Sequence, residues 1–522
     1  MRIYISIFTA IICFSSMQSQ EISVADAYRY SIDNTTGTAR FRALSGAMGA
    51  LGGDLSAINI NPAGSAVFAN NQVAVTASNF GIKNNSTYFG KQTSDKNNAL
   101  EINQAGGVFV FENNNSSSDW KKFSLGLNYE NTNNFDNKLY SAGLNSNNSI
   151  GNYFRNYANA FGGISVSNLI LNPNEQFGEL YSYLGSEPTL GFVAQQVFLG
   201  YQAFIIDKDP TYDENTNRNY ISLVPTDVIY NQQNSIYTTG YNGKFSFNFA
   251  TQYKDKLYLG VNLNTHFSDY RKSTKFTETN NYVNSTSIDA VRNINFNNDI
   301  YTYGSGFSFQ LGAIFKLMKP LSVGVAYQSP TWITLNDELI QTISATSGNN
   351  SRELDPDFVD PKITNVYEPY NIQTPSKYSG SLAYVFGKKG LISFDYGLKD
   401  YSNMSFRPES DLVFKGLNQA IVRDARKQTS EYRVGAEYRI EKVSLRGGYR
   451  YEQSPYKNSL TIGNLTSYSG GLGYNFGDTK LDLAYTFAKR AYQEQFFPQG
   501  MTDRAVINSL NNTVTLTLAF EL

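Results

Sequence analysis

The chain is most regular in TSEYRVGAEYRIEKVSLRGGYRY, residues 429–451. On each side of a polar turn at Glu441-Lys442, apolar or small residues alternate with charged or polar ones. Successive side chains of a β-strand point to opposite faces, so this stretch predicts two strands with one apolar and one polar face. A soluble sheet shows the same alternation, and the rest of the chain decides between soluble and membrane-embedded strands.

The N-terminus predicts export from the cytoplasm. Met1-Arg2 is a short basic start, and residues 3–16 form an apolar run of the length that a secretory signal needs. We therefore expect residues 1–20 to be a signal peptide that is cleaved near Ser19 or Gln20. The only cysteine, Cys13, lies inside this segment, so the exported protein would have no disulfide and no thiolate metal site.

The composition favours a membrane barrel over a helical membrane protein. The mean hydropathy is −0.37, and no stretch after the signal approaches the roughly twenty apolar residues of a spanning helix. Yet the chain has 38 Tyr and 35 Phe, which barrels place at both membrane interfaces. The net charge of −1 gives no indication of nucleic-acid binding.

The strand count and the lengths of the connections agree with each other. Six connections are short and polar, and the other seven are longer, which fits an even number of strands with both termini on the periplasmic side. The predicted fold is all-β: a transmembrane antiparallel β-barrel of about fourteen strands, within residues 71–522. The predicted strands are 72–82, 103–112, 121–131, 242–253, 256–268, 304–317, 320–331, 376–386, 390–401, 429–440, 442–452, 466–476, 479–489 and 511–522.

One outside connection, 132–241, is far longer than an ordinary loop. Its stretches 150–164 and 190–205 carry apolar residues at helical spacing, and the second is apolar nearly all round, so we expect short helices that are buried. Two interpretations stay open: the helices pack on each other and cap the barrel, or they form an apolar groove for a ligand. The groove would be lined by Phe192, Val193, Val197, Phe198, Tyr201 and Phe204.

Residues 21–70 lack the period of a strand. They are rich in Gly, Ala and Ser and contain GALGGDLSAININPAG, which predicts a packed plug inside the barrel; a loose N-terminal arm is the alternative. Pro62 fixes its own φ and keeps Asn61 out of helical space, while Ala63 and Gly64 allow a close approach to the wall.

The N-terminal stretch and several later stretches resemble those of a known family. GALGGDLSAININPAG looks like the N-terminal hatch of the FadL/TodX outer-membrane transporters, and Asn61, Pro62 and Ala63 match the family's Asn-Pro-Ala motif. The likeness continues through SVGVAYQSP (322–330), residues 374–406, 432–455 and LDLAYTF (481–487). The resemblance implies a fourteen-strand barrel with a hatch, uptake of hydrophobic molecules by diffusion, and lateral release through the wall.

Arginines and glutamates share the polar face of the strands within 429–451. This pattern indicates a salt-bridge network that braces the barrel, or one free guanidinium that pairs with the carboxylate of an amphipathic ligand. The candidates for that second role are Arg433, Arg446 and Arg450.

The chain offers little for catalysis or metal binding. His266 is the only histidine, and no G-x-S-x-G occurs. In Asp213-x-Asn215-x-Asn217 a calcium loop is only partly matched, because Arg218 and Val224 stand where Gly and Glu are needed. We expect no enzyme activity, no cofactor and no metal site.

The expected function is passive transport of long-chain fatty acids or other hydrophobic small molecules across a Gram-negative outer membrane. The alternative is a FadL-like barrel of the PorV type, which serves as a partner in protein secretion and not as an importer. The expected partners are membrane lipid, a hydrophobic ligand and the barrel-assembly machinery, with no nucleic acid and a monomeric protein.

Overall fold

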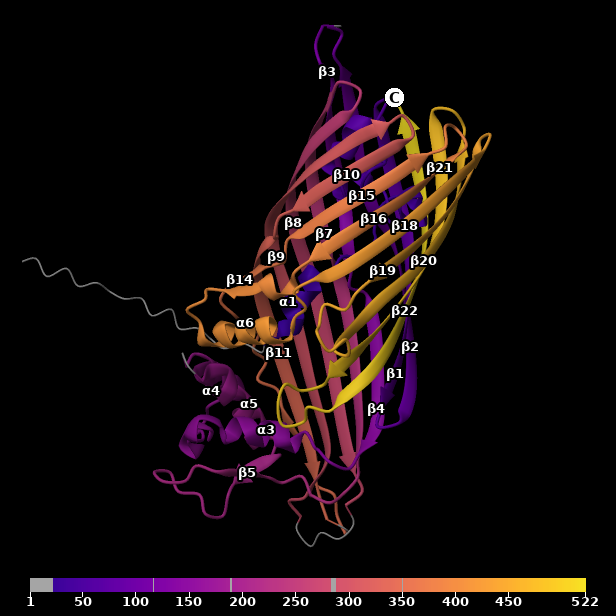
Figure 1. The fold of residues 1–522 in the computed structure, drawn as a ribbon. Helices are drawn as coiled ribbons and strands as arrows, with labels where there is room; N and C mark the ends of the chain where they lie inside the picture. Colours follow the sequence, from indigo (N-terminus) through magenta and orange to yellow (C-terminus); the bar gives the residue numbers. More distant parts are fainter. Residues whose placement is uncertain (1–21, 116, 188–189, 283–287, 350) are drawn as a thin grey trace, which may run out of the picture.

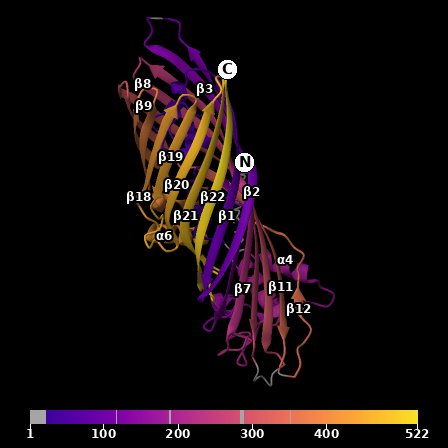
Figure 2. The ribbon, with the colours of Figure 1, turned by 90° about the vertical axis from the view of Figure 1, so that its right-hand side faces the viewer.

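The structure is a computed structural model that describes residues 22–522 except 116, 188–189, 283–287 and 350. The predicted signal peptide, 1–20, lies outside the described residues. Fourteen antiparallel strands form a closed barrel, as predicted, because the first and last strands pair with each other over Gln72–Thr87. Figures 1 and 2 show the barrel, with the C-terminus at the end where the connections are short.

Several wall strands are interrupted and consist of two labelled pieces. The wall strands in chain order are β1 (Gln72–Tyr88), β2 (Lys91–Glu112), β3 (Trp120–Asn134) with β4 (Asn137–Asn145), β7 (Tyr230–Tyr253), β8 (Leu257–Asn280), β9 (Val291–Met318), β10 (Leu321–Gln328) with β11 (Trp332–Ser347), β14 (Tyr370–Gln373) with β15 (Lys377–Val385), β16 (Gly390–Lys399) with β17 (Ser405–Arg407), β18 (Thr429–Ile440), β19 (Val443–Glu452), β20 (Ile462–Asn475), β21 (Thr479–Gln495) and β22 (Arg504–Glu521).

The alternation of faces follows the sequence pattern. On β22, Val514, Leu516 and Leu518 are exposed, whereas Thr515 and Thr517 between them are buried. The buried threonines hydrogen-bond across to β1, with Thr76 to Thr517 at 2.8 Å. The barrel therefore has an apolar outer surface and a polar, filled interior.

Several strands are longer than the sequence predicts. β8 and β9 continue through most of 269–303, and β4 and β7 take up both ends of the predicted loop 132–241. The outer side chains of these extensions are polar, such as Arg271, Ser273 and Lys275 of β8, so the hydrophobic period is missing although the backbone pairing continues. A strand outside the membrane needs no apolar outer face, which is why the periodicity did not reveal it.

The remaining connection between β4 and β7, residues 146–229, is a helical insertion that lies beside the strand extensions (Figure 1). The insertion and the other outside loops contain both short helices and short strands. They are α3 (Gly151–Ala158), η3 (Ala160–Gly162), η4 (Val166–Asn168), α4 (Phe177–Gly185), α5 (Gly191–Gln202), β5 (Ile206–Lys208), β6 (Tyr220–Ser222), β12 (Asp357–Val359), β13 (Asn365–Val366), η5 (Tyr401–Asn403) and α6 (Leu412–Asp424).

The N-terminal segment, residues 22–71, crosses from the outside loops to the opposite end. Its α1 (Val24–Ser31) packs on α6, with Tyr28 stacked on Tyr401 and Tyr456, so this helix lies on the loop side and not on the periplasmic side. Further along, α2 (Ala39–Ala43) contacts β19 to β22, and η2 (Pro62–Val67) with η1 (Ala57–Asn59) lies against the other side of the wall, where η2 meets β3 and β7 to β9.

Among the described residues, no helix combines the length and the apolar character that crossing a membrane requires.

Candidate functional site

The Asn61–Gly64 motif is fastened to the wall by hydrogen bonds. Asn61 is 1 % exposed, and its Nδ2 donates to the carbonyls of Gly49 at 2.8 Å and Ala313 at 3.0 Å. Its Oδ1 accepts from the backbone N–H of Ala63 at 3.2 Å and so caps η2, with Pro62 in the first helical position. The side-chain amide thus links the N-terminal segment to itself and to β9.

The wall has glycines where this motif touches it. Side chains at Gly260, Gly312 and Gly324, on β8, β9 and β10, would overlap the backbone of Pro62-Ala63, the amide of Asn61 and the carbonyl of Gly49. The three glycines therefore form a shallow seat for the motif. The sequence analysis did not identify this seat, although a lumen-facing glycine on each of three adjacent strands was the available signal.

Ion pairs fasten the segment on another side. The carboxylate of Asp33 lies 2.9 Å from Lys377 and 2.8 Å from Lys399, on β15 and β16. Burial opposes the negative charge, but the two ammonium groups outweigh it and hold the pKa of Asp33 below its ordinary value. Arg40 adds a bond of 3.1 Å to Glu437 of β18.

The three arginines that the sequence offers as partners for a ligand carboxylate all form ion pairs within the wall. Arg433 and Arg450 each lie 2.6 Å from Glu431, and Arg450 also pairs with Glu452 at 2.7 Å. Arg446 bonds Glu437 at 2.7 Å and Asp482 at 2.5 Å. These contacts correspond to the bracing network that was the alternative from the sequence, because the guanidinium charges are already neutralised by carboxylates of the same strands.

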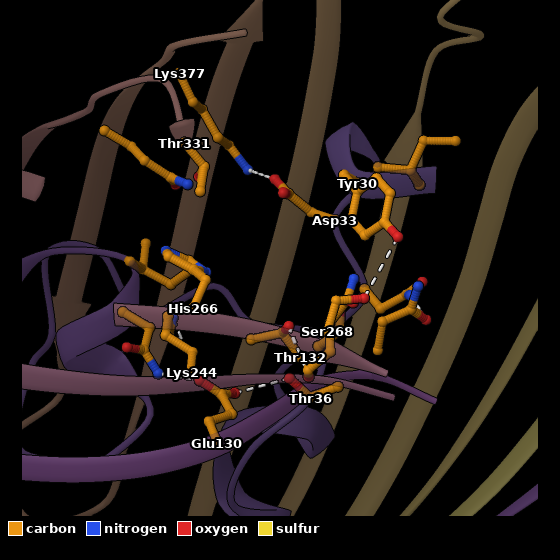
Figure 3. A pocket seen from close by; sticks show the side chains of 18 of the residues that line it. Tyr30, Asp33, Thr36, Glu130, Thr132, Lys244, His266, Ser268, Thr331 and Lys377 are labelled. Atoms are coloured by element: carbon orange, nitrogen blue, oxygen red, sulfur yellow. Dashed lines mark hydrogen bonds and ion pairs between the residues drawn. The ribbon is translucent and has the colours of Figure 1, made fainter. Parts of the chain in front are cut away.

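A polar cavity of about 150 Å³ lies between the N-terminal segment and the wall (Figure 3). Asp33 and Thr36 face it from the segment, and Thr36 donates to Glu130 of β3 at 2.7 Å. His266 also lines it and is within 2.8 Å of the hydroxyl of Ser308. No group of three or more His, Cys, Asp or Glu in the described part of the chain is placed to hold a metal ion.

A larger and more apolar cavity, of about 410 Å³, lies between α1 and the strand extensions. Its polar rim includes Asp26 and Arg29 of α1, which form an ion pair of 2.6 Å. Its apolar lining comes from five chain segments, so the sequence alone did not indicate it. That lining is Ile22, Val24, Ile236, Phe296, Ile300, Leu339, Phe496 and Phe497.

The six predicted groove residues do not line either cavity. Val197 and Phe198 are fully buried in the core of the helical insertion, where Phe198 meets Phe177 and Tyr181. Val193 and Tyr201 pack on the same core, Phe192 packs on Leu339 and Tyr367, and Phe204 is 56 % exposed. The helices of the insertion therefore pack on one another, which was the structural alternative from the sequence. They do so because α5 is apolar on nearly every side and must be covered on every side.

The hydrogen-bond ladder of the wall is interrupted beside β3. Pairing between β2 and β3 ends at Gln104 and Glu130, and Lys91–Ile102 of β2 pairs with β1 alone, while β4 pairs with β7. Among the described residues, side chains bridge the gap in place of a backbone ladder. The amide of Asn131 donates to Glu101 at 2.6 Å, and Asn134 donates to the same carboxylate. Further along, Thr93 of β2 and Asn84 of β1 donate to the carbonyls of Tyr140 and Lys138 of β4. We call this interruption the β2–β3 gap.

The comparisons with known proteins agree with the barrel. A model of the family described as outer membrane protein transport protein (OMPP1/FadL/TodX) matches residues 242–515, more than half of the chain. A FadL homologue from Pseudomonas aeruginosa is similar at 11 % identity and TM-score 0.52, with 94 % of this chain and 99 % of that chain covered.

Two hydrocarbon transporters are also similar. The toluene transporter TodX from Pseudomonas putida has 14 % identity and TM-score 0.47, with 93 % of this chain and 98 % of that chain covered. TbuX from Ralstonia pickettii has 13 % identity and TM-score 0.46, with the same coverage. No curated protein matches. The family match, together with the barrel, leads to one conclusion: this chain belongs to the OMPP1/FadL/TodX family of outer membrane transport proteins.

Proposed function

We propose that the protein is a passive channel for hydrophobic small molecules, with long-chain fatty acids as one candidate class. The observation that carries this proposal is the apolar cavity of about 410 Å³ between α1 and the strand extensions. A cavity of this size with an apolar lining and a few polar groups at its rim is typical of sites for small organic ligands. The similar proteins TodX and TbuX are described as toluene transporters, which supports the same class of cargo.

The proposed path begins at this cavity and continues past the N-terminal segment. We infer that the segment acts as a plug, since Asn61, Asp33 and Arg40 fasten it to different parts of the wall. These polar contacts can each be exchanged for water at small net cost, and the barrel closes through β1 and β22 without the segment, so a shift of the plug is compatible with an intact barrel. No catalytic step is part of the proposal.

For release we propose the β2–β3 gap. Ladder pairing between β2 and β3 is absent there, and the described residues bridge the gap through side chains, such as Glu101 with Asn131 and Thr93 with the carbonyl of Tyr140. An apolar molecule that leaves through the wall would enter the outer membrane directly and avoid a polar exit through the plug. The resemblance to the FadL/TodX family supports this lateral route.

A second candidate function is that of a partner in protein secretion, of the PorV type. The size of the helical insertion, 146–229, favours it, because ligand capture does not explain so large an outside structure. The two functions differ in what should accompany the purified protein: lipids or hydrocarbons in the first case, a stoichiometric protein in the second.

The function is tested by uptake. The protein is expressed in an outer membrane that lacks its own channel of this family, and uptake of radiolabelled oleate and toluene is compared with that of a sugar. Faster uptake of a hydrophobic tracer with unchanged sugar uptake supports the proposal. Unchanged uptake of both tracers, with a protein partner seen by native mass spectrometry, would favour the secretion function.

A further inference from the structure

Arg42 is a buried cation without a partner. It lies in α2 of the N-terminal segment and is 4 % exposed. Its Nε and Nη1 atoms make no hydrogen bond to any described residue, and no ion pair with it is present. Glu130 is near enough to stabilise the positive charge of Arg42 but forms no ion pair with it. The buried lumen arginines Arg433, Arg446 and Arg450 are neutralised by carboxylates, so Arg42 differs from them.

An unpaired buried charge is costly. Removing an ion from water is costly even after the surrounding protein relaxes. An opposite charge normally offsets this cost. Among the described residues, the aromatic ring that faces it is Phe80 of β1, whose centroid is 5.5 Å from the guanidinium carbon. Such a contact is much weaker than an ion pair and does not replace an anion. The guanidinium therefore has unused capacity for a negatively charged group.

The guanidinium faces a cavity of about 140 Å³ between the segment and the strands β1 and β20 to β22. One part of the lining is polar, with Ser467, Thr513 and Thr486, and the hydroxyl of Thr486 is buried without a hydrogen-bond partner among the described residues. Two charged groups also line the cavity: Arg450, which is paired with Glu431 and Glu452, and Asp136, whose carboxylate accepts from the backbone N–H of Gly240. The other part is apolar. It consists of Phe80, Ile82, Leu465 and Ala488. This division fits a small anionic head group that is attached to an apolar body.

The same cavity adjoins the β2–β3 gap. Asn133 and Asn134 line it, and Asn134 also donates to Glu101, the side chain that crosses the gap. A molecule that is held at Arg42 would thus be the last one inside the wall before the proposed outlet. The cavity is distinct from the apolar cavity at α1, with which it shares no lining residue.

We propose that Arg42 binds the carboxylate of an amphipathic monocarboxylate, a chain or ring that carries one acid group, just inside the β2–β3 gap. The proposal deepens the proposed function and rests on it. Arg450 is already paired with Glu431 and Glu452, so the one unpaired guanidinium of this cavity matches one negative charge, whereas a dianionic phosphate would leave a second charge buried and unpaired. The hydroxyls of Thr486 and Thr513 would supply further donors to the carboxylate.

The experiment compares two ligands that differ only in the head group. Dodecanoate and dodecanol are titrated calorimetrically into the full-length protein in maltoside detergent at pH 8, where the acid is ionised. We expect the wild type to bind dodecanoate about tenfold or more tightly than dodecanol, as a charge-assisted hydrogen bond implies. Arg42→Met should remove this preference, and Arg42→Lys should keep part of it.

The matched control is Arg439→Met, which removes a guanidinium that lines none of the cavities described here and should leave the preference unchanged. Assembly of each variant is checked by the difference in gel mobility between boiled and unboiled protein. Since Arg42→Met could fail to assemble, a crystal structure of the wild type with 2-bromododecanoate gives an independent result. We expect anomalous signal from bromine in the cavity beside Arg42.

Each outcome has a distinct meaning. Equal binding of dodecanoate and dodecanol, a preference that survives Arg42→Met, or bromine only at another place would overturn the Arg42 site and leave the channel function standing. Failure of the wild type to bind either ligand would overturn the proposed function, and the Arg42 site with it.

Discussion

The N-terminal segment and the helical insertion both lie against the barrel strands, but the balance of interactions differs. The segment packs side chains such as Tyr28 and Phe41 in apolar clusters and is also fastened by buried amide hydrogen bonds and ion pairs, such as those of Asn61 and Asp33. The insertion is held by packed rings, with Phe154 against Phe296 at 5.4 Å between centroids. A hydrogen bond contributes about 0.5–1.5 kcal/mol net because water replaces it, whereas each buried apolar side chain contributes about 1.5–3 kcal/mol. We therefore expect the segment to shift more readily than the insertion.

The largest expected effect comes from polar substitutions in the insertion. Val197→Asp with Phe198→Asp should unfold residues 146–229 while the barrel assembles, because two fully buried side chains are replaced by charges at a total cost above about 4 kcal/mol. Limited proteolysis with mass spectrometry should then cut within this range. Phe204→Asp is the control, since that side chain is already 56 % exposed. A double variant that is not cut would mean that apolar packing does not hold the insertion together.

Removal of the segment should open the barrel. Deletion of residues 22–70 takes away the groups that fill the lumen, and we expect conductance in planar bilayers to rise severalfold or more above that of the full chain, with leakage of small polar solutes. The strands should still assemble, because β1 and β22 close the barrel by backbone pairing that does not involve the segment. A deletion that assembles with background conductance would mean that loops or wall side chains close this barrel.

A smaller change tests the glycine seat. Gly312→Ala places a methyl group where the amide of Asn61 lies and should displace the motif, with a partial rise in conductance. Gly380→Ala is the matched control, because open space surrounds that position on the neighbouring region of the wall. Equal conductance of the two variants would show that the seat does not hold the segment.

The smallest expected effect concerns the motif itself. Asn61→Ala deletes the buried amide and Pro62→Gly releases the φ restraint, and the loss of a satisfied buried polar group costs about 1–3 kcal/mol. Uptake of a hydrophobic tracer should change severalfold at normal surface abundance. Asn70→Ala, at an exposed position just outside the motif, should have no effect. Identical uptake in all three variants would mean that the motif plays no part in transport.

The sequence predicted the barrel because lipid contact imposes a period on every spanning strand, as Val514, Leu516 and Leu518 show. It also indicated the helices of the insertion, since α3 and α5 fall within 150–164 and 190–205. It did not reveal which arginine lacks a partner, because pairing depends on the register between strands: Arg433 lies opposite Arg450, and both reach Glu431. Arg42 was missed for the same reason, since its surroundings come from four distant strands.

The strand extensions carry the apolar cavity away from the lipid-facing band of the barrel. On β8 the exposed apolar side chains end near Leu263, and the strand continues to Asn280. At about 3.3 Å per residue, those seventeen residues reach roughly 55 Å along the strand beyond the lipid-facing band. The apolar cavity, which Lys272 and Thr274 help to line, lies partway along this extension. Under the proposed function, molecules would be collected above the bilayer surface, before they dissolve in its outer leaflet.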